Sequence, residues 1–137
     1  MDRPAVGCLS PNARRRKPTG DCTNAVLVGA GGSTSSFLVD DDVEVFVNGV
    51  SVFADNNENV TRIQPIALGP LRGGDTVRVV ASETANPQFC PGAFQLDPVT
   101  LYCPARRTSQ VINPNTVRGI SQVCGEVFFD RTITVAL

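Results

Sequence analysis

The chain has 137 residues, with 12 Lys and Arg residues against 13 Asp and Glu residues, so its formal net charge is −1. It contains no His and no Trp, and without His it lacks the usual general base near neutral pH and the commonest metal ligand. The hydrophobic content of 42% is too high for a disordered chain, and no apolar run approaches the ~18 residues that span a bilayer. We therefore expect one folded, non-enzymatic domain outside membranes.

The start of the chain carries charge of the opposite sign to the rest. Residues 1–20 hold five basic groups and one acid, giving +4, whereas the remaining residues hold seven basic and twelve acidic groups, giving −5. Residues 1–24 are rich in Pro, Arg and Asn without periodicity, so we predict an extended N-terminal arm. Its basic run consists of Arg14, Arg15, Arg16 and Lys17.

The basic run is a candidate binding segment. It contains no interleaved aromatic residue on which bases could stack, so specific nucleic-acid recognition is not expected. We predict that the run binds an acidic protein surface, and the acidic remainder of a second copy is such a surface. The alternative is a solvated tail without a partner.

From Ala25 onward, short β-type runs alternate with Gly, Pro, Asn and Asp, and no stretch shows the 3.6-residue period of a long amphipathic helix. This pattern predicts an all-β fold, an antiparallel β-sandwich or jelly roll of short strands, with residues 25–137 as a single domain. The predicted strands lie near residues 25–29, 36–39, 43–47, 50–54, 61–68, 75–82, 99–102, 108–112, 122–129 and 131–136.

The clearest local signal is a predicted β-hairpin over residues 43–53. Asn48-Gly49 suits a type I′ turn, which needs positive φ at both central positions. A two-residue turn pairs Val47 with Val50 and fixes the register of the residues that follow. The valines expected on the core-facing side are Val43, Val45, Val47, Val50 and Val52.

Two phenylalanines fall on the other side of this hairpin. In the same register Val45 pairs with Val52, so Phe46 and Phe53 share the face opposite the valines. On that face they contact either a partner subunit or a second layer of the same chain.

The open end of the hairpin gathers acidic residues. The register places Asp42 opposite Asp55, with Asp40 and Asp41 beside them. Opposed carboxylates destabilise a strand pair, and Ca²⁺, which takes roughly six to eight oxygen ligands, removes that cost. Asp75, in a neighbouring Gly-Gly-Asp turn, is a further candidate ligand. These residues predict a calcium site; the alternative is that they cap turns and stay solvated.

Five cysteines are many for a chain of this length. None forms a CxxC motif, which argues against a zinc finger or a thioredoxin-like site. We predict disulfides with Cys8–Cys22 and Cys90–Cys103 as nearest-neighbour pairs, but other pairings stay open, as does a set of buried thiols. Disulfides indicate an oxidising or extracellular setting. The start shows no apolar signal-peptide core, so either a leader has been removed or the protein reaches the outside without one, as parts of a virus particle do.

Two stretches resemble extracellular β-sandwich domains of bacteria and phages. Residues 37–50, Phe-Leu-Val-Asp-Asp-Asp-Val-Glu-Val-Phe-Val-Asn-Gly-Val, resemble the DDxVxVxVNG hairpin of such domains. Residues 74–81, Gly-Asp-Thr-Val-Arg-Val-Val-Ala, are similar to the strand that follows it there. The resemblance covers residues 36–103 and implies a sandwich used for binding or assembly, often alongside calcium and without catalytic residues. The lack of Trp departs from sugar-binding sandwiches, which usually present it for stacking.

These features favour a structural protein, and the leading hypothesis is a virion decoration (cement) protein. It would dock on a capsid or scaffold lattice, or on copies of itself, through its sandwich and its N-terminal arm. The alternative is a calcium-dependent extracellular binding module, with carbohydrate as a candidate ligand, from a secreted bacterial protein. The oppositely charged arm favours the first hypothesis, and the acidic end of the hairpin favours the second.

Overall fold

The computed structural model describes residues 21–56 and 59–137, and within these ranges the chain forms β-strands and no helix. The all-β prediction is therefore confirmed. Nor does any described segment form an apolar helix of membrane-spanning length. The strands are β2 (Cys22–Val28), β3 (Phe37–Asp40), β4 (Asp42–Val47), β5 (Val50–Asp55), β6 (Thr61–Ile63), β7 (Ile66–Leu71), β8 (Thr76–Ser82), β9 (Ala93–Leu96), β10 (Val99–Cys103), β11 (Thr108–Asn113), β12 (Val117–Ile120) and β13 (Val127–Thr134).

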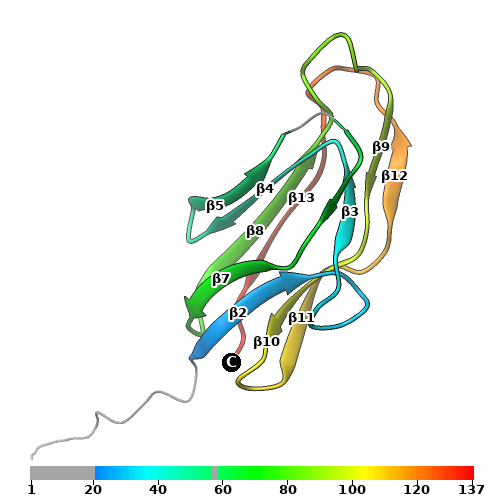
Figure 1. Cartoon of the computed structure of the whole chain (residues 1–137). Helices are drawn as coiled ribbons and strands as arrows, with labels where there is room; N and C mark the ends of the chain where they lie inside the picture. The colour runs from blue at the N-terminus through cyan, green and yellow to red at the C-terminus, as the bar shows by residue number, and fades with distance from the viewer. Residues whose placement is uncertain (1–20, 57–58) are drawn as a thin grey trace, which may run out of the picture.

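The strands form two packed layers (Figure 1). One layer is a four-stranded sheet with the order β13-β8-β4-β5. The other layer consists of two four-stranded sheets placed end to end, β11-β10-β2-β7 and β12-β9-β3-β6. Their orders correspond because β2 leads into β3, β6 into β7, β9 into β10, and β11 into β12. The described strand pairs are antiparallel, as predicted for a sandwich.

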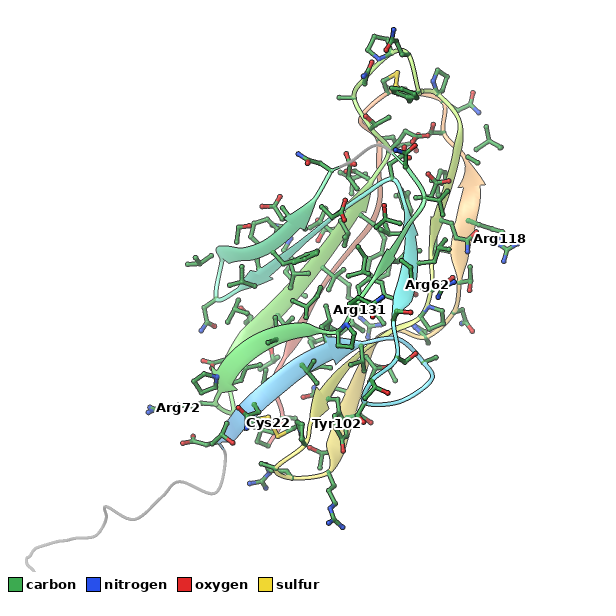
Figure 2. All side chains as sticks on the ribbon, viewed as in Figure 1. Cys22, Arg62, Arg72, Tyr102, Arg118 and Arg131 are labelled. Atoms are coloured by element: carbon green, nitrogen blue, oxygen red, sulfur yellow. A yellow bond between two sulfur atoms is a disulfide. The ribbon has the colours of Figure 1, made fainter. Side chains whose placement is uncertain are left out.

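The two ends of the sandwich differ in character. One end, here called the acidic end, holds the connections β3–β4, β8–β9 and β12–β13. The acidic residues that define it are Asp40, Asp41, Asp42, Asp55 and Glu83. The opposite end, here called the turn end, holds the turns β4–β5, β7–β8 and β10–β11. Figure 2 shows Cys22 and Arg72 at the turn end, so the chain enters β2 at the end away from these acids.

The core lies between the layers and takes apolar side chains from both. Phe37 and Leu96 from the double sheet and Val45 and Val79 from the other layer are fully buried. In β8 buried residues alternate with partly or fully exposed ones, which is the two-residue period of a strand with one face on a core. Each such large side chain contributes roughly 1.5–3 kcal/mol of transfer free energy on burial.

The predicted hairpin forms, and its register is as expected close to the turn. Asn48 and Gly49 have φ values of 50° and 80°, Val47 pairs with Val50, and Phe46 pairs with Ser51. The positive φ values explain why Asn-Gly marks the turn, since both residues tolerate this conformation.

Beyond Ser51 the register shifts by one residue at a β-bulge. Phe53, rather than Val52, pairs with Val45, and Phe53 packs against the core. Val50 and Val52 are 66% and 46% exposed, so the prediction that both are core residues is wrong. The reason is that β5 is an edge strand whose bulge turns its residues relative to those of β4.

Several strand boundaries also differ from the prediction. The structure adds β9 and β12, splits the predicted strand 61–68 at Gln64-Pro65, and replaces the last two predicted strands by the single strand β13. Proline has no N–H to donate, which ends β6. Because β2 begins at Cys22, residues 22–24 belong to the sandwich rather than to the arm.

The disulfides are present but are paired differently. Cys22 bonds to Cys103 across 81 residues, and Cys90 bonds to Cys124 across 34 residues. The nearest-neighbour pairings Cys8–Cys22 and Cys90–Cys103 are therefore wrong, because strand pairing brings distant segments together. Cys8 itself lies outside the described residues. Two disulfides are typical of proteins in oxidising or extracellular settings.

Candidate functional site

The acidic residues of the acidic end come from three strands, β3, β4 and β5, and from two connections, β3–β4 and β8–β9. Val43 pairs with Asp55, and Asp42 pairs with Ser82 at the end of β8. The bulge in β5 thus moves Asp55 one residue away from its predicted position opposite Asp42. The prediction that acids gather at this end is nevertheless confirmed, since Asp42 and Asp55 line one pocket there. The residue after β8 adds Glu83, which sequence reasoning missed.

Asp41 and Glu83 form a buried carboxyl pair at this end. Asp41 is 5% exposed, Glu83 is 1% exposed, and their side chains hydrogen-bond to each other. The backbone N–H of Thr84 donates to Oδ2 of Asp41 at 3.2 Å and to Oε1 of Glu83 at 3.3 Å. The hydroxyl of Ser121 donates to Oε2 of Glu83 at 2.7 Å. Each carboxyl group therefore has partners in the interior.

Burial sets the protonation of this pair. Burial and a hydrogen bond with Asp40 raise the pKa of Asp41 above its ordinary value. Burial, followed by the hydrogen bond to Asp41, raises the pKa of Glu83. Ionising both of two carboxyl groups in contact costs electrostatic free energy in a low-dielectric interior. The pair therefore retains a proton to higher pH than free carboxyl groups do.

A disulfide fixes the loops that carry the pair's partners. Cys90–Cys124 joins the β8–β9 connection to the β12–β13 connection. Beside it, the N–H of Gly92 donates to the Ser121 hydroxyl at 2.9 Å, and the N–H of Ser121 donates to the Gly92 carbonyl at 2.8 Å. The disulfide thus holds Ser121 in place over Glu83.

This geometry is unsuited to carboxylate catalysis at the pair itself. Glycoside hydrolases hold their two carboxyl groups roughly 5–9.5 Å apart so that a sugar or water fits between them. Asp41 and Glu83 are in direct hydrogen-bond contact and are both buried, so no substrate atom fits between them. The contact instead ties the β3–β4 connection, which crosses between the layers, to the residue that follows β8.

A second acidic surface lies on the outer side of the same end. Asp42, Glu44 and Asp55 line a pocket of about 220 Å³. Among residues 21–56 and 59–137, however, no group of three or more acidic or cysteine side chains is arranged to hold a metal ion. The described residues therefore give the calcium prediction no support at Asp40, Asp41, Asp42 and Asp55.

Asp75 is not part of the acidic end, and its predicted role as a ligand there is wrong. It lies at the turn end, where its Oδ1 accepts a hydrogen bond of 3.2 Å from Nδ2 of Asn48. Its Oδ2 accepts a hydrogen bond of 2.8 Å from the N–H of Arg72. The hydrogen bond from Arg72, then that from Asn48, lowers the pKa of Asp75. Asp75 thus fastens the β7–β8 turn to the hairpin turn.

The predicted partner-binding residues are divided between different places. The basic run, Arg14, Arg15, Arg16 and Lys17, lies outside the described residues. Phe46 lies on the outer face of its layer, where the guanidinium of Arg78 stands 5.3 Å from the ring centroid. Phe53 faces the core instead, which excludes it from an outer-face contact with Phe46.

Exposed apolar side chains cluster in the chain segments that form the acidic end. The large hydrophobic residues exposed there are Phe89, Ile120, Val123 and Val127. Two of them belong to the loops that Cys90–Cys124 joins, and two belong to the adjoining ends of β12 and β13. No sequence period marks them, because they come from a loop-rich region. Large exposed apolar groups of this kind suit contact with a partner.

Comparison with known proteins gives no match: no family model, no curated protein and no solved structure is similar to the chain at a significant level.

Proposed function

We propose that the protein is a non-enzymatic assembly protein of the kind that decorates a virion shell, with shell subunits or copies of itself as partners. The observation that carries this proposal is the separation of charge along the molecule. Five acidic residues gather at one end of the sandwich, and the N-terminal segment with its net charge of +4 joins the opposite end at Cys22.

The length of the N-terminal segment favours binding of its basic run to another molecule rather than to its own sandwich. β2 and β3 lead from Cys22 to Asp40 and contain eleven residues, about 35 Å of strand at ~3.3 Å per residue. Arg14 precedes Cys22 by eight residues, so its backbone extends at most about 28 Å from Cys22. The basic run is thus poorly placed to reach the acidic end of its own copy, but is free to reach that of a neighbour.

Two further features agree with an assembly protein. The exposed apolar side chains at the acidic end provide a surface that a partner would bury. The two disulfides suit a particle that persists outside the cell, where thiols are not kept reduced.

The proposal is tested by measuring the mass of the assembled protein. Sedimentation velocity is compared for the full chain and for a chain without residues 1–20, at low salt and at about 0.5 M salt, which screens exposed charges. We expect oligomers of the full chain at low salt, and monomers of the truncated chain with unchanged circular dichroism. A charge-reversed chain with R14E and R16E should behave like the truncation, whereas R106E with R107E at the turn end should not. Assembly of the truncated chain equal to that of the full chain would contradict the proposal.

A further inference from the structure

The two lateral edges of the sandwich, where the layers end side by side, differ in how far hydrogen bonds bridge the layers. On the side of β11 and β13, hydrogen bonds bridge the layers. Nε2 of Gln110 donates to the carbonyl of Thr134 at 3.0 Å, and its Oε1 accepts from the N–H of Ala136 at 2.9 Å. Nη1 of Arg131, labelled in Figure 2, donates to the carbonyl of Ile112 at 3.0 Å. This side is therefore fastened by the protein's own residues.

On the opposite side, β5 and the β6–β7 segment border a groove of about 410 Å³. Val52 and Phe53 line it from β5, and Ile63, Ile66 and Ala67 line it from the other layer. Ile63 and Ile66 are buried, whereas Val52 is 46% exposed, so apolar surface is accessible along the groove. The sandwich is thus left open where its two layers end.

The strands that border the groove are edge strands of their sheets. β5 ends one layer, and β6 and β7 end the two halves of the other. An edge strand presents backbone N–H and C=O groups to which a further extended segment can bond. Pairing to a backbone edge with side chains in an apolar groove is a known mode of peptide recognition. The groove therefore suits an extended chain segment.

The acidic residues at one end of the groove indicate the charge of the segment that binds there. The groove is lined by two charged residues, Arg62, whose Nη1 donates to the Ser36 hydroxyl at 3.3 Å, and Asp55. Asp55 also lines the neighbouring acidic pocket with Asp42 and Glu44. A segment that follows the groove towards the acidic end thus passes from apolar surface to carboxylates. The complementary sequence is apolar first and basic afterwards.

We propose that this groove binds the N-terminal segment of a second copy of the chain, an inference that rests on the proposed function. Residues 5–9 of that copy, Ala-Val-Gly-Cys-Leu, would lie along the groove, and residues 14–17 would reach the acidic end. Residues 5–17 span about 40 Å when extended, which exceeds the roughly 20 Å of the six-residue strand β5 and extends past it to the acids.

The direction of the chain favours a second copy over the same copy. β2 runs from the turn end towards the acidic end, so the segment preceding Cys22 joins the sandwich at its turn end. If the turn end of a second copy contacts the acidic end of the first, the basic run of the second copy lies next to the acidic residues of the first. Its preceding residues then continue into the groove. In the same copy the backbone at Arg14 extends at most about 28 Å from Cys22, which is less than the roughly 35 Å of strand between Cys22 and Asp40.

Cysteine cross-linking of the full chain tests this placement. Cys22, Cys90, Cys103 and Cys124 are held in disulfides, so Cys8 is the cysteine left to report the position of the segment. A second cysteine is introduced in the groove as Val52→Cys, or as Ala67→Cys from the facing layer. The matched control is Val111→Cys, an exposed valine on β11 away from the groove. After mild oxidation, non-reducing electrophoresis and peptide mass spectrometry identify which cysteines are linked.

We expect intermolecular links from Cys8 to position 52 or 67 at a yield at least about tenfold above that to position 111. Equal yields at all three positions, or none, would overturn the placement in the groove. A Cys8 link to the groove within a monomer would overturn the assignment to a second copy. Neither result would affect assembly measured with unmodified chains, so a failed placement is distinguishable from a failed proposed function.

Discussion

Asp41 and Glu83, 42 residues apart in the sequence, hydrogen-bond to each other side chain to side chain inside the acidic end of the sandwich. Glu83 follows β8 in one layer, and Asp41 lies at the crossing from β3 to β4. The pair thus joins the crossing between the layers to the end of a central strand. Its strength depends on the proton that the two groups share.

Stability should fall as pH rises through the range in which this proton is lost. The folded-state pKa values of Asp41 and Glu83 are raised above their ordinary values of 3.8 and 4.5. A group with a raised pKa contributes stability that is fully present below its ordinary pKa and is lost above its folded pKa. We therefore expect the melting temperature to decrease as pH is increased from about 4.5 towards neutrality. Calorimetric scans across this range measure the slope.

The variant Glu83→Gln should remove most of this slope. Its amide donates to the Asp41 carboxylate without titrating, and its oxygen still accepts from Ser121. We expect stability at pH 7 to rise by about 1 kcal/mol, since each tenfold change in proton affinity corresponds to about 1.4 kcal/mol. The control is Glu44→Gln on the outer acidic pocket, which removes the same charge without touching the pair. Equal slopes for Glu83→Gln and the unmodified chain would show that the pair does not titrate as described.

The two disulfides should differ in what their removal affects. In the chain-entropy model, alanine at Cys22 and Cys103 costs about 4.5 kcal/mol for a separation of 81 residues, and alanine at Cys90 and Cys124 about 3.8 kcal/mol for 34 residues. The second pair also holds Ser121 over Glu83, so its loss should alter the pH slope as well. Denaturant unfolding at several pH values checks both effects. A change of slope with the Cys22–Cys103 variant would contradict this assignment.

The parts of the fold that were predictable have local causes. Asn48-Gly49 marks the hairpin because both residues adopt positive φ, and this depends on no distant contact. The gathering of Asp42 with Asp55 follows from the turn, because the register carries along the strands to within one residue. The all-β class likewise follows from frequent turn residues between short apolar runs.

The parts that were not predictable depend on the pairing of strands distant in the sequence or on edge position. Cys103 forms its disulfide with Cys22 because β10 pairs with β2. The spacing of the cysteines in the sequence does not reveal this pairing. Glu83 lies next to Asp41 because β8 pairs with β4. Val52 has the alternation of a core residue, but it lies on an edge strand at a bulge, so it is exposed.

The turn end offers a test of the Asn48–Asp75 contact. In Asn48→Ala the N–H of Thr76 loses its 2.9 Å acceptor, Asp75 loses its 3.2 Å donor, and alanine must adopt a φ of 50°. We expect a loss of about 1–2 kcal/mol at pH 7, with alanine at the exposed Asn115 as the control. Because the pKa of Asp75 is lowered, its stabilisation is present above 3.8 and lost as pH falls further. The variant should therefore lose less stability on acidification than the unmodified chain; an equal loss would contradict the role of Asn48.

Addition of calcium should leave the melting temperature of the full chain unchanged. Asp75 lies at the turn end, Asp41 is buried in its contact with Glu83, and no other group of described acids is arranged around an ion. A site filled at one hundred times its dissociation constant would add about 2.7 kcal/mol, which is roughly 8 °C for a chain of this size. Calorimetric scans with millimolar CaCl₂ and with EDTA measure the difference, and MgCl₂ controls for ionic strength. A calcium-specific increase that the variant Asp42→Asn abolishes would establish a metal site at the acidic end.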